Sequence, residues 1–292
     1  MRNVSVIARR ELTSLFTSPL AYVAGAVFLL LVGVLFATMV FQPGQEASMR
    51  ALFMMMVPAL VLAIPLLTMP LMSEEYARGT IETMMTAPVT ESDLVLGKFA
   101  GALGFYVLLL ATTLLHLALL AVFGEPETGQ ALMGYFGMLL VGAMFISIGL
   151  FFSCTTKYQL LAALLGVVVL AALTLLPMLP FQLFGNAWVV AFKVFDYVGV
   201  PRFFEAFAKG FFDTRSLVFF VSVTARWMVA SSSRMFPGQW ETRSWRQASG
   251  LKPPISFPSG RRYFSRKCSA SGMMSSLRSR RGGSVTVITF RR

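Results

Sequence analysis

The sequence predicts an all-α integral membrane protein with about six membrane-spanning helices, of which the sixth is truncated. The 292-residue chain is 56% hydrophobic and only 13% charged, whereas soluble domains carry about a quarter charged residues. Its mean hydropathy is +0.71. The apolar residues gather in runs close to the roughly 20 residues that a helix needs to cross a bilayer. Polar residues gather between these runs, and the largest group is the charged segment at residues 73–98.

Residues 1–18 precede the first apolar run and are amphipathic at helical spacing. The apolar face holds Val4, Ile7, Ala8, Leu12, Leu15 and Phe16, and the basic residues elsewhere are Arg2, Arg9 and Arg10. This pattern is typical of a helix in the membrane interface. The alternative is a basic flank that only orients the first span. Both interpretations put the N-terminus in the cytoplasm, because basic residues are enriched on that side of a membrane. We expect no cleavable signal peptide.

Six apolar segments predict the spans of one membrane domain at residues 1–225. They cover residues 20–41, 52–72, 99–123, 131–152, 160–180 and, partially, 217–230. The second contains Pro58, Pro65 and Pro70, so we expect it to be kinked. The aromatic-rich residues 181–216 are too polar to span, and we expect one or two helices there at the outer interface.

The composition changes near residue 225. Residues 1–225 hold 11 basic and 12 acidic side chains, whereas residues 226–292 hold 14 basic side chains and one acidic side chain. The Ser/Arg-rich tail is typical of a disordered segment. Because the basic charge is confined to this tail, it does not indicate nucleic-acid binding by the protein as a whole. We expect lipid, and no nucleic acid, as a partner.

The charged segment predicts an ordered element between the second and third spans. Glu74, Arg78 and Glu82 recur every four residues, and on a helix this spacing gives two ion pairs. Pro88 ends this element, and Thr90 is suited to cap the next helix. Adjacent spans need only a handful of connecting residues. A longer connection with helix-forming patterns therefore favours a docking element for a soluble partner over a solvated tether.

The same segment resembles the motif of ABC-2 type exporter permeases. The likeness rests on Glu74-Glu75-x-x-x-Gly79-Thr80-x-Glu82-x-Met84-Met85-Thr86-x-Pro88-Val89, followed by Gly97-Lys98. It is similar to the branch that includes the gliding-motility-associated and nitrous-oxide-reductase-maturation permeases. Two further segments, at 152–159 and 204–215, support the resemblance, which covers about residues 1–225.

The resemblance implies the permease subunit of an ATP-driven exporter in a bacterial inner membrane. In that family the element between the second and third spans is a coupling helix that docks on a separate ATP-binding subunit, and two permease halves pair as a homodimer or heterodimer. It assigns coupling to Glu74, Glu75, Arg78, Gly79, Thr80, Glu82 and Pro88. The sequence has no Gly-rich Lys-Ser/Thr phosphate loop. We therefore expect ATP in the partner, and no catalytic residue, cofactor or metal site in this chain.

Two other classes of function compete with an exporter. One is a membrane scaffold or regulatory subunit without a transport path. The other is an intramembrane hydrolase built on His116, the only histidine, and Ser147. Because Ser147 lacks the Gly-x-Ser-x-Gly surround of many serine nucleophiles, we expect His116 to pack between helices or to line the path.

The remaining sulfur and glycine patterns indicate packing. The methionines at positions 54–56 are consecutive, so on a helix they diverge and cannot converge on one copper ion. Cys154 and Cys268 form no disulfide framework. Gly97 and Gly101 have the spacing that permits close approach of another helix.

The tail gives a further hypothesis. In the family that the chain resembles, the last span would continue apolar past Ala225, but here Ser/Arg-rich sequence follows. We hypothesise that the residues after about 225 come from a shifted reading frame or an altered gene end. Translating the other two frames tests this idea, which fails if neither frame continues an apolar helix.

Overall fold

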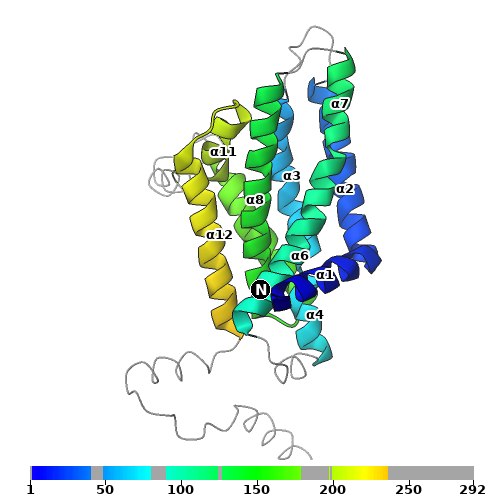
Figure 1. The fold of residues 1–292 in the computed structure, drawn as a ribbon, viewed down its shortest axis with the longest axis vertical. Coiled ribbons are helices and arrows are strands. Elements are labelled where there is room, and N and C mark those ends of the chain that lie inside the picture. Colours follow the sequence, from blue (N-terminus) through cyan, green and yellow to red (C-terminus); the bar gives the residue numbers. More distant parts are fainter. Residues whose placement is uncertain are drawn as a thin grey trace, which may run out of the picture. The chain divides into compact units, whose positions relative to one another are not determined.

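The computed structural model describes residues 2–40, 49–79, 90–123, 127–178, 197 and 199–235, and every regular element among them is a helix. Six helical segments in this part of the chain are long and apolar enough to cross a membrane (Figure 1). They cover Pro19–Val40, Arg50–Arg78, Glu91–Val122, Thr128–Thr155, Gln159–Met178 and Thr214–Arg234. The predicted all-α membrane fold is confirmed.

The first span follows an N-terminal helix, α1 (Arg2–Thr17), that packs across the start of α6 (Glu91–Thr112). Ser18 separates α1 from α2 (Pro19–Leu35), which begins with proline, a residue suited to the first turn because its missing N–H would have no partner there. The span ends in the π-helical turn η1 (Phe36–Val40). Figure 1 shows α1 crossing the bundle beside α6 rather than continuing the line of α2.

The second span consists of α3 (Arg50–Thr68) and the short helix α4 (Pro70–Arg78). The predicted kink lies at Met69–Pro70, where Pro70 cannot donate a backbone hydrogen bond. Pro58 and Pro65 lie inside α3. The kink sets α4 apart as a separate nine-residue helix at the end of the span.

The third span consists of α6 and α7 (Leu114–Phe123), with a joint at Thr113. Thr90 caps the start of α6, because its hydroxyl accepts the N–H of Asp93 at 3.2 Å, as the sequence predicted. At the joint, the Tyr135 hydroxyl donates to the Thr113 carbonyl at 2.9 Å.

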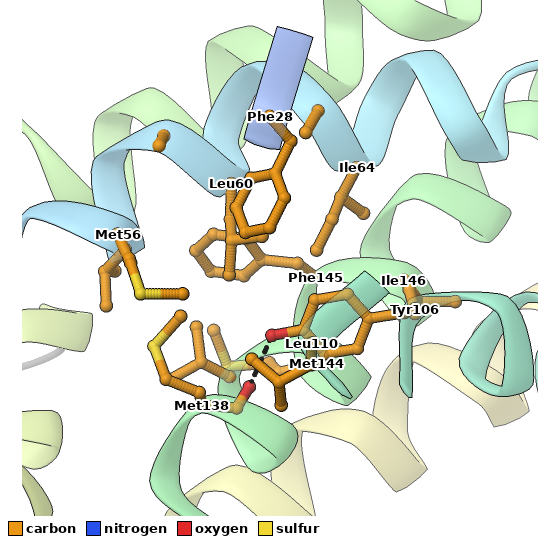
Figure 2. Packing of buried hydrophobic residues seen from close by; sticks show 14 of the residues in the cluster. Phe28, Met56, Leu60, Ile64, Tyr106, Leu110, Met138, Met144, Phe145 and Ile146 are labelled. Carbon is orange, nitrogen blue, oxygen red and sulfur yellow. Dashed lines mark hydrogen bonds between the residues drawn. The ribbon is translucent and has the colours of Figure 1, made fainter. Parts of the chain in front are cut away.

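The fourth span, α8 (Thr128–Thr155), is the helix on which α3, α4 and α6 pack, together with the later helices α9 (Gln159–Thr174), α11 (Val200–Ala208) and α12 (Thr214–Met235). Its glycines receive side chains from neighbouring helices: a Cβ on Gly142 would lie 2.1 Å from the Tyr106 ring, and one on Gly134 would lie 2.2 Å from the Phe53 ring. Figure 2 shows Tyr106 in this core, where its hydroxyl donates to the Met138 carbonyl at 2.9 Å. The glycines of α8 thus set how closely α3 and α6 approach it.

The short helix α11 (Val200–Ala208) packs on α8 and α3 at the end of the bundle away from α4. It follows α9 (Gln159–Thr174) and η2 (Leu176–Met178) in the described chain. Phe204 and Phe207 are fully buried, and a Cβ on Gly137 of α8 would touch both. These two aromatics therefore pack into the helix bundle, because Gly137 leaves room for them, and the interfacial position of this segment stays a prediction. Residues 181–196 of that predicted segment lie outside the described residues.

The sixth span is longer than predicted, since α12 (Thr214–Met235) continues well past Ala225. Trp227 packs edge-on against Phe151, with ring centroids 4.8 Å apart. Ser231 donates its hydroxyl to the carbonyl of Trp227 at 2.8 Å, and such back-bonding satisfies a polar side chain within its own helix. The expected truncation is thus wrong for the helix, although its mean hydropathy of 1.2 is below the 2.1 to 2.6 of the other five spans.

Candidate functional site

The predicted coupling residues divide into those on α4 and those beyond it. Glu74, Glu75 and Arg78 lie on α4, and Gly79 follows its last turn. Thr80, Glu82 and Pro88 lie outside the described residues. The predicted helix at the start of the charged segment is therefore present, and it is the end of the second span.

The outer face of α4 carries an exposed ion pair between Glu74 and Arg78, one helical turn apart, as the spacing predicted. The Arg78 side chain is 71% exposed, so the pair contributes little to stability. Gly79 then adopts a left-handed φ of 70°, and nothing lies within 4 Å of the place where a Cβ would sit. Glycine is favoured there for its backbone conformation, which ends α4.

Ser153 of α8 occupies the break between α3 and α4. Its hydroxyl oxygen accepts the N–H groups of Met72 at 3.0 Å and Ser73 at 3.1 Å, and its proton goes to the Met69 carbonyl at 2.9 Å. Ser73 also donates its own hydroxyl to that carbonyl. The first N–H groups of a helix have no partner within the helix. Ser153 therefore supplies the missing hydrogen-bond acceptor at the start of α4 and also attaches α4 to α8.

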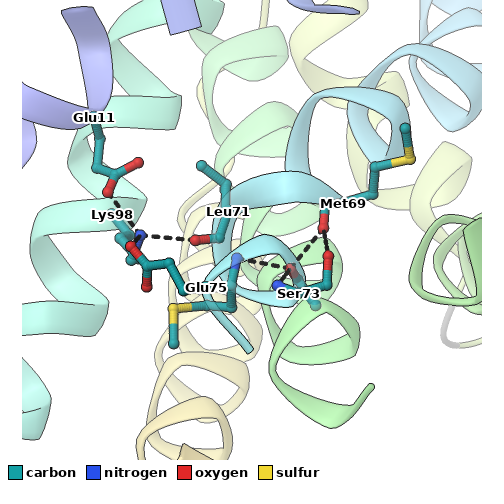
Figure 3. Close-up of polar contacts among 8 residues, drawn as sticks. Glu11, Met69, Leu71, Ser73, Glu75 and Lys98 are labelled. Carbon is teal, nitrogen blue, oxygen red and sulfur yellow. Dashed lines mark hydrogen bonds and ion pairs between the residues drawn. The ribbon is translucent and has the colours of Figure 1, made fainter. Parts of the chain in front are cut away.

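Lys98 of α6 lies on the other side of α4, where it holds two carboxylates (Figure 3). Its ammonium nitrogen lies 2.6 Å from Glu11 Oε1, 2.8 Å from Glu75 Oε1 and 2.7 Å from the Leu71 carbonyl oxygen. An ammonium group has three donors, and each has an acceptor here. The side chains of Lys98, Glu11 and Glu75 are only 1%, 11% and 15% exposed. We call these three residues the Lys98 cluster.

Close packing of α1 on α6 brings Glu11 to this cluster. A Cβ on Gly97 would lie 2.6 Å from a methyl carbon of Ile7, and a Cβ on Gly101 would lie 2.7 Å from Glu11 Cβ and 3.0 Å from the Ala8 carbonyl oxygen. The close helix approach predicted from the two glycines is therefore confirmed, and α1 is the helix that uses it.

The structure turns Glu75, one of the predicted coupling residues, away from the exposed face of α4. Glu75 faces Lys98, whereas Glu74 and Arg78 face outward. Lys98 and Ser153 lie in segments that resemble the family, but sequence reasoning gave neither of them, nor Glu11, a role of its own. Lys98 carried a usable signal, because an isolated cation at the start of an apolar helix needs a partner. The partner itself could not be deduced, since Glu11 is 87 residues away in the chain.

The residues considered for an intramembrane hydrolase have other neighbours. The His116 ring on α7 packs edge-on against Phe36, with centroids 4.9 Å apart, and its Nδ1 lies 3.3 Å from the Thr113 carbonyl oxygen. Ser147 is buried in α8 and donates to the Met144 carbonyl at 2.7 Å. These bonds stay within each residue's own span. Within the described part of the chain, no group of three or more His, Cys, Asp or Glu side chains is placed to hold a metal ion.

A second charged cluster lies at the opposite end of the second span. Glu205 of α11 accepts Lys209 at 2.6 Å and Arg50 at 3.4 Å. The hydrogen bond from Lys209, together with the charges of Lys209 and Arg50, lowers the pKa of Glu205. These side chains are 40% to 47% exposed. The two ends of the span thus differ, with a buried ion cluster beside α4 and an exposed one beside α11.

Comparison with known proteins gives one family match. A family model described as an ABC-2 family transporter protein matches residues 5–194. The matched region contains most of α1, all of α4 and the first five candidate spans. No curated protein matches the chain.

Proposed function

This chain belongs to the ABC-2 family of transporter proteins, and on that premise we propose that it is the permease subunit of an ATP-driven exporter whose ATP-binding subunit is a separate protein. The observation that carries the proposal is α4, a short charged helix set apart from its span by the Met69–Pro70 break. Its outer face presents Glu74 and Arg78. We propose that this face, continued by Gly79, Thr80, Glu82 and Pro88, docks on the ATP-binding subunit.

The sequence supports the division of labour between two proteins. It contains no Gly-rich Lys-Ser/Thr loop of the kind that holds nucleotide phosphates. ATP binding and hydrolysis are therefore assigned to the partner. This chain would contribute the transmembrane path and the element that receives the partner's movement.

The family resemblance supports a bacterial inner membrane, and the basic residues of α1, which precedes the first span, support placing α4 and the N-terminus in the cytoplasm. Exposed basic residues lie at both ends of the bundle: Arg9, Arg10, Arg78 and Lys157 at the α4 end, and Arg50, Arg202, Lys209 and Arg215 at the α11 end. At the α11 end, Arg50 and Lys209 are paired with Glu205. Basic residues are enriched on the cytoplasmic side. The narrower likeness to the gliding-motility and nitrous-oxide-maturation branch stays a prediction.

We further propose that two permease halves pair. The exposed face of α2 is apolar, with Tyr22 58% exposed, Val23 59% exposed and Leu30 66% exposed. Lipid or a second half suits such a face. Family resemblance supports a homodimer or a heterodimer equally.

The proposal is tested by co-expressing the chain with candidate ATP-binding subunits from the same genome. A photo-reactive residue replaces the exposed Ala77 of α4, and a matched control replaces Leu132 at the opposite end of α8, which is 68% exposed. We expect one ATP-binding subunit to co-purify and to cross-link from position 77 but not from position 132. Failure of every candidate to bind would favour a scaffold or regulatory subunit.

A further inference from the structure

We propose that Lys98 is a positioning residue that makes α1, α4 and α6 move as one unit, so that displacement of α4 reaches the third span. This inference rests on the proposed function, because it concerns the same docking helix. Lys98 joins Glu11 of α1 to Glu75 and Leu71 of α4.

The position of α4 depends on contacts with other helices. It has nine residues, and isolated helices of that length are marginal in water. A proline break precedes it and the left-handed Gly79 follows it. Both ends therefore depart from regular helix, so contacts with other helices contribute to the orientation of α4.

Two attachments hold α4, and they act at different places. Ser153 binds the first turn through the N–H groups of Met72 and Ser73 and so ties it to α8. Lys98 binds Leu71 and Glu75, one turn apart, and so ties the side of α4 to α6. If only Ser153 held α4, the helix could rotate about its first turn. The contacts of Lys98 with Leu71 and Glu75 are a second attachment, which prevents this rotation.

The chemistry of the Lys98 cluster suits positioning. All three donors of the ammonium group have acceptors within 2.8 Å, and Lys98 is buried. Buried ion pairs add little net stability over apolar packing, but loss of one partner leaves a buried charge without compensation. The cluster therefore resists any rearrangement that separates one of the three helices from the other two.

The first test measures geometry and needs no ATPase. Spin labels are placed at exposed Thr13 of α1 and Ala77 of α4, in a chain in which Cys154 and Cys268 are alanine. We expect a narrow distance distribution in the parent and a broad one in Lys98→Met. A control pair at Leu132 and Val218, on α8 and α12, should stay unchanged.

A matched variant separates positioning from loss of charge in general. Lys209→Met also removes a lysine bound to a glutamate at 2.6 Å, but at the exposed cluster. It should leave the α1–α4 distribution narrow. An unchanged α1–α4 distribution in Lys98→Met overturns the proposal. If Lys98→Met does not insert, Glu75→Gln decides by the same measurement, with the same two outcomes.

The second test uses the complex. In Lys98→Met we expect the ATP-binding subunit to co-purify as before, with its permease-dependent ATP hydrolysis reduced about tenfold, a typical size for coupling between sites. Undiminished hydrolysis overturns a role in transmission. If no ATP-binding subunit binds the parent chain, the proposed function fails, and the distance measurement still decides whether Lys98 holds the three helices together.

Discussion

Lys98 Nζ lies 2.6 Å from Glu11 Oε1, so the third span is joined by a buried ion pair to the helix that precedes the first span. The same nitrogen reaches Glu75 of α4. Three helices that the chain order separates therefore meet at one ammonium group.

Removing one member of the Lys98 cluster should cost more than removing all three. Lys98→Met leaves Glu11 and Glu75 facing each other without a cation, and breaking a buried pair in this way costs about 3–5 kcal/mol. A triple variant with Glu11→Leu, Glu75→Leu and Lys98→Met should be less destabilised than Lys98→Met alone. Unfolding of the purified chain by denaturing detergent measures both. Equal or greater loss in the triple variant would contradict the role assigned to charge.

Gly101→Ala should loosen α1 from α6. Its Cβ would lie 3.0 Å from the Ala8 carbonyl oxygen and 2.7 Å from Glu11 Cβ, so the backbone must shift, at a typical cost of about 1–3 kcal/mol. Faster tryptic cleavage at Arg9 and Arg10 reports the change. Gly33→Ala is the control, because its Cβ meets nothing within 4 Å. Equal cleavage of the two variants would show that α1 does not need this close approach.

Ser153→Ala should weaken the first turn of α4. The buried N–H groups of Met72 and Ser73 would lose their acceptor, and an unsatisfied buried donor costs about 1–3 kcal/mol. We expect faster amide hydrogen exchange at these two residues. Ser147→Ala is matched to it, since that buried hydroxyl bonds only to the Met144 carbonyl of its own helix. Unchanged exchange in Ser153→Ala would mean that α8 does not hold α4.

Gly79→Ala should uncouple transport from ATP hydrolysis while membrane insertion stays intact. An L-residue in the left-handed conformation costs about 1–2 kcal/mol, so the end of α4 would change its course into the predicted docking surface. Substitution of Glu82 should have the same effect. Export and hydrolysis assayed together check both, with Gly33→Ala as the control. Undiminished export in both variants would remove these residues from the coupling element.

The helices were predictable because each one depends on local chemistry. The length of the apolar runs predicted the spans, Pro70 predicted the kink, and Thr90 predicted the start of α6. The spacing of Gly97 and Gly101 indicated a close helix contact. In each case the residues that carried the prediction lie within a short segment of the chain, although the helix that contacts Gly97 and Gly101 is distant.

The features that could not be predicted from the sequence depend mainly on contacts between distant segments of the chain. Glu75 matched a family motif, but its inward position follows from Lys98 and Glu11. Ser153 looks like an ordinary turn residue in the sequence. Its role follows only from the packing of α8, which brings its hydroxyl to the Met69 carbonyl. The length of α12 was underestimated because Arg226 and the serines were counted as polar, whereas Arg226 is exposed at the surface of the helix and Ser231 bonds within it.

The joint at Thr113 limits how far a movement at Lys98 can travel. From Lys98 to the end of α6 the helix is about 21 Å long at 1.5 Å per residue, so a 5° tilt displaces its far end by roughly 2 Å. Beyond that point α7 is a separate segment, and the Tyr135 hydroxyl fastens the joint to α8. The third span therefore consists of two helices joined at a point that is held on α8. The tilt of α6 and the movement of α7 can then differ in size.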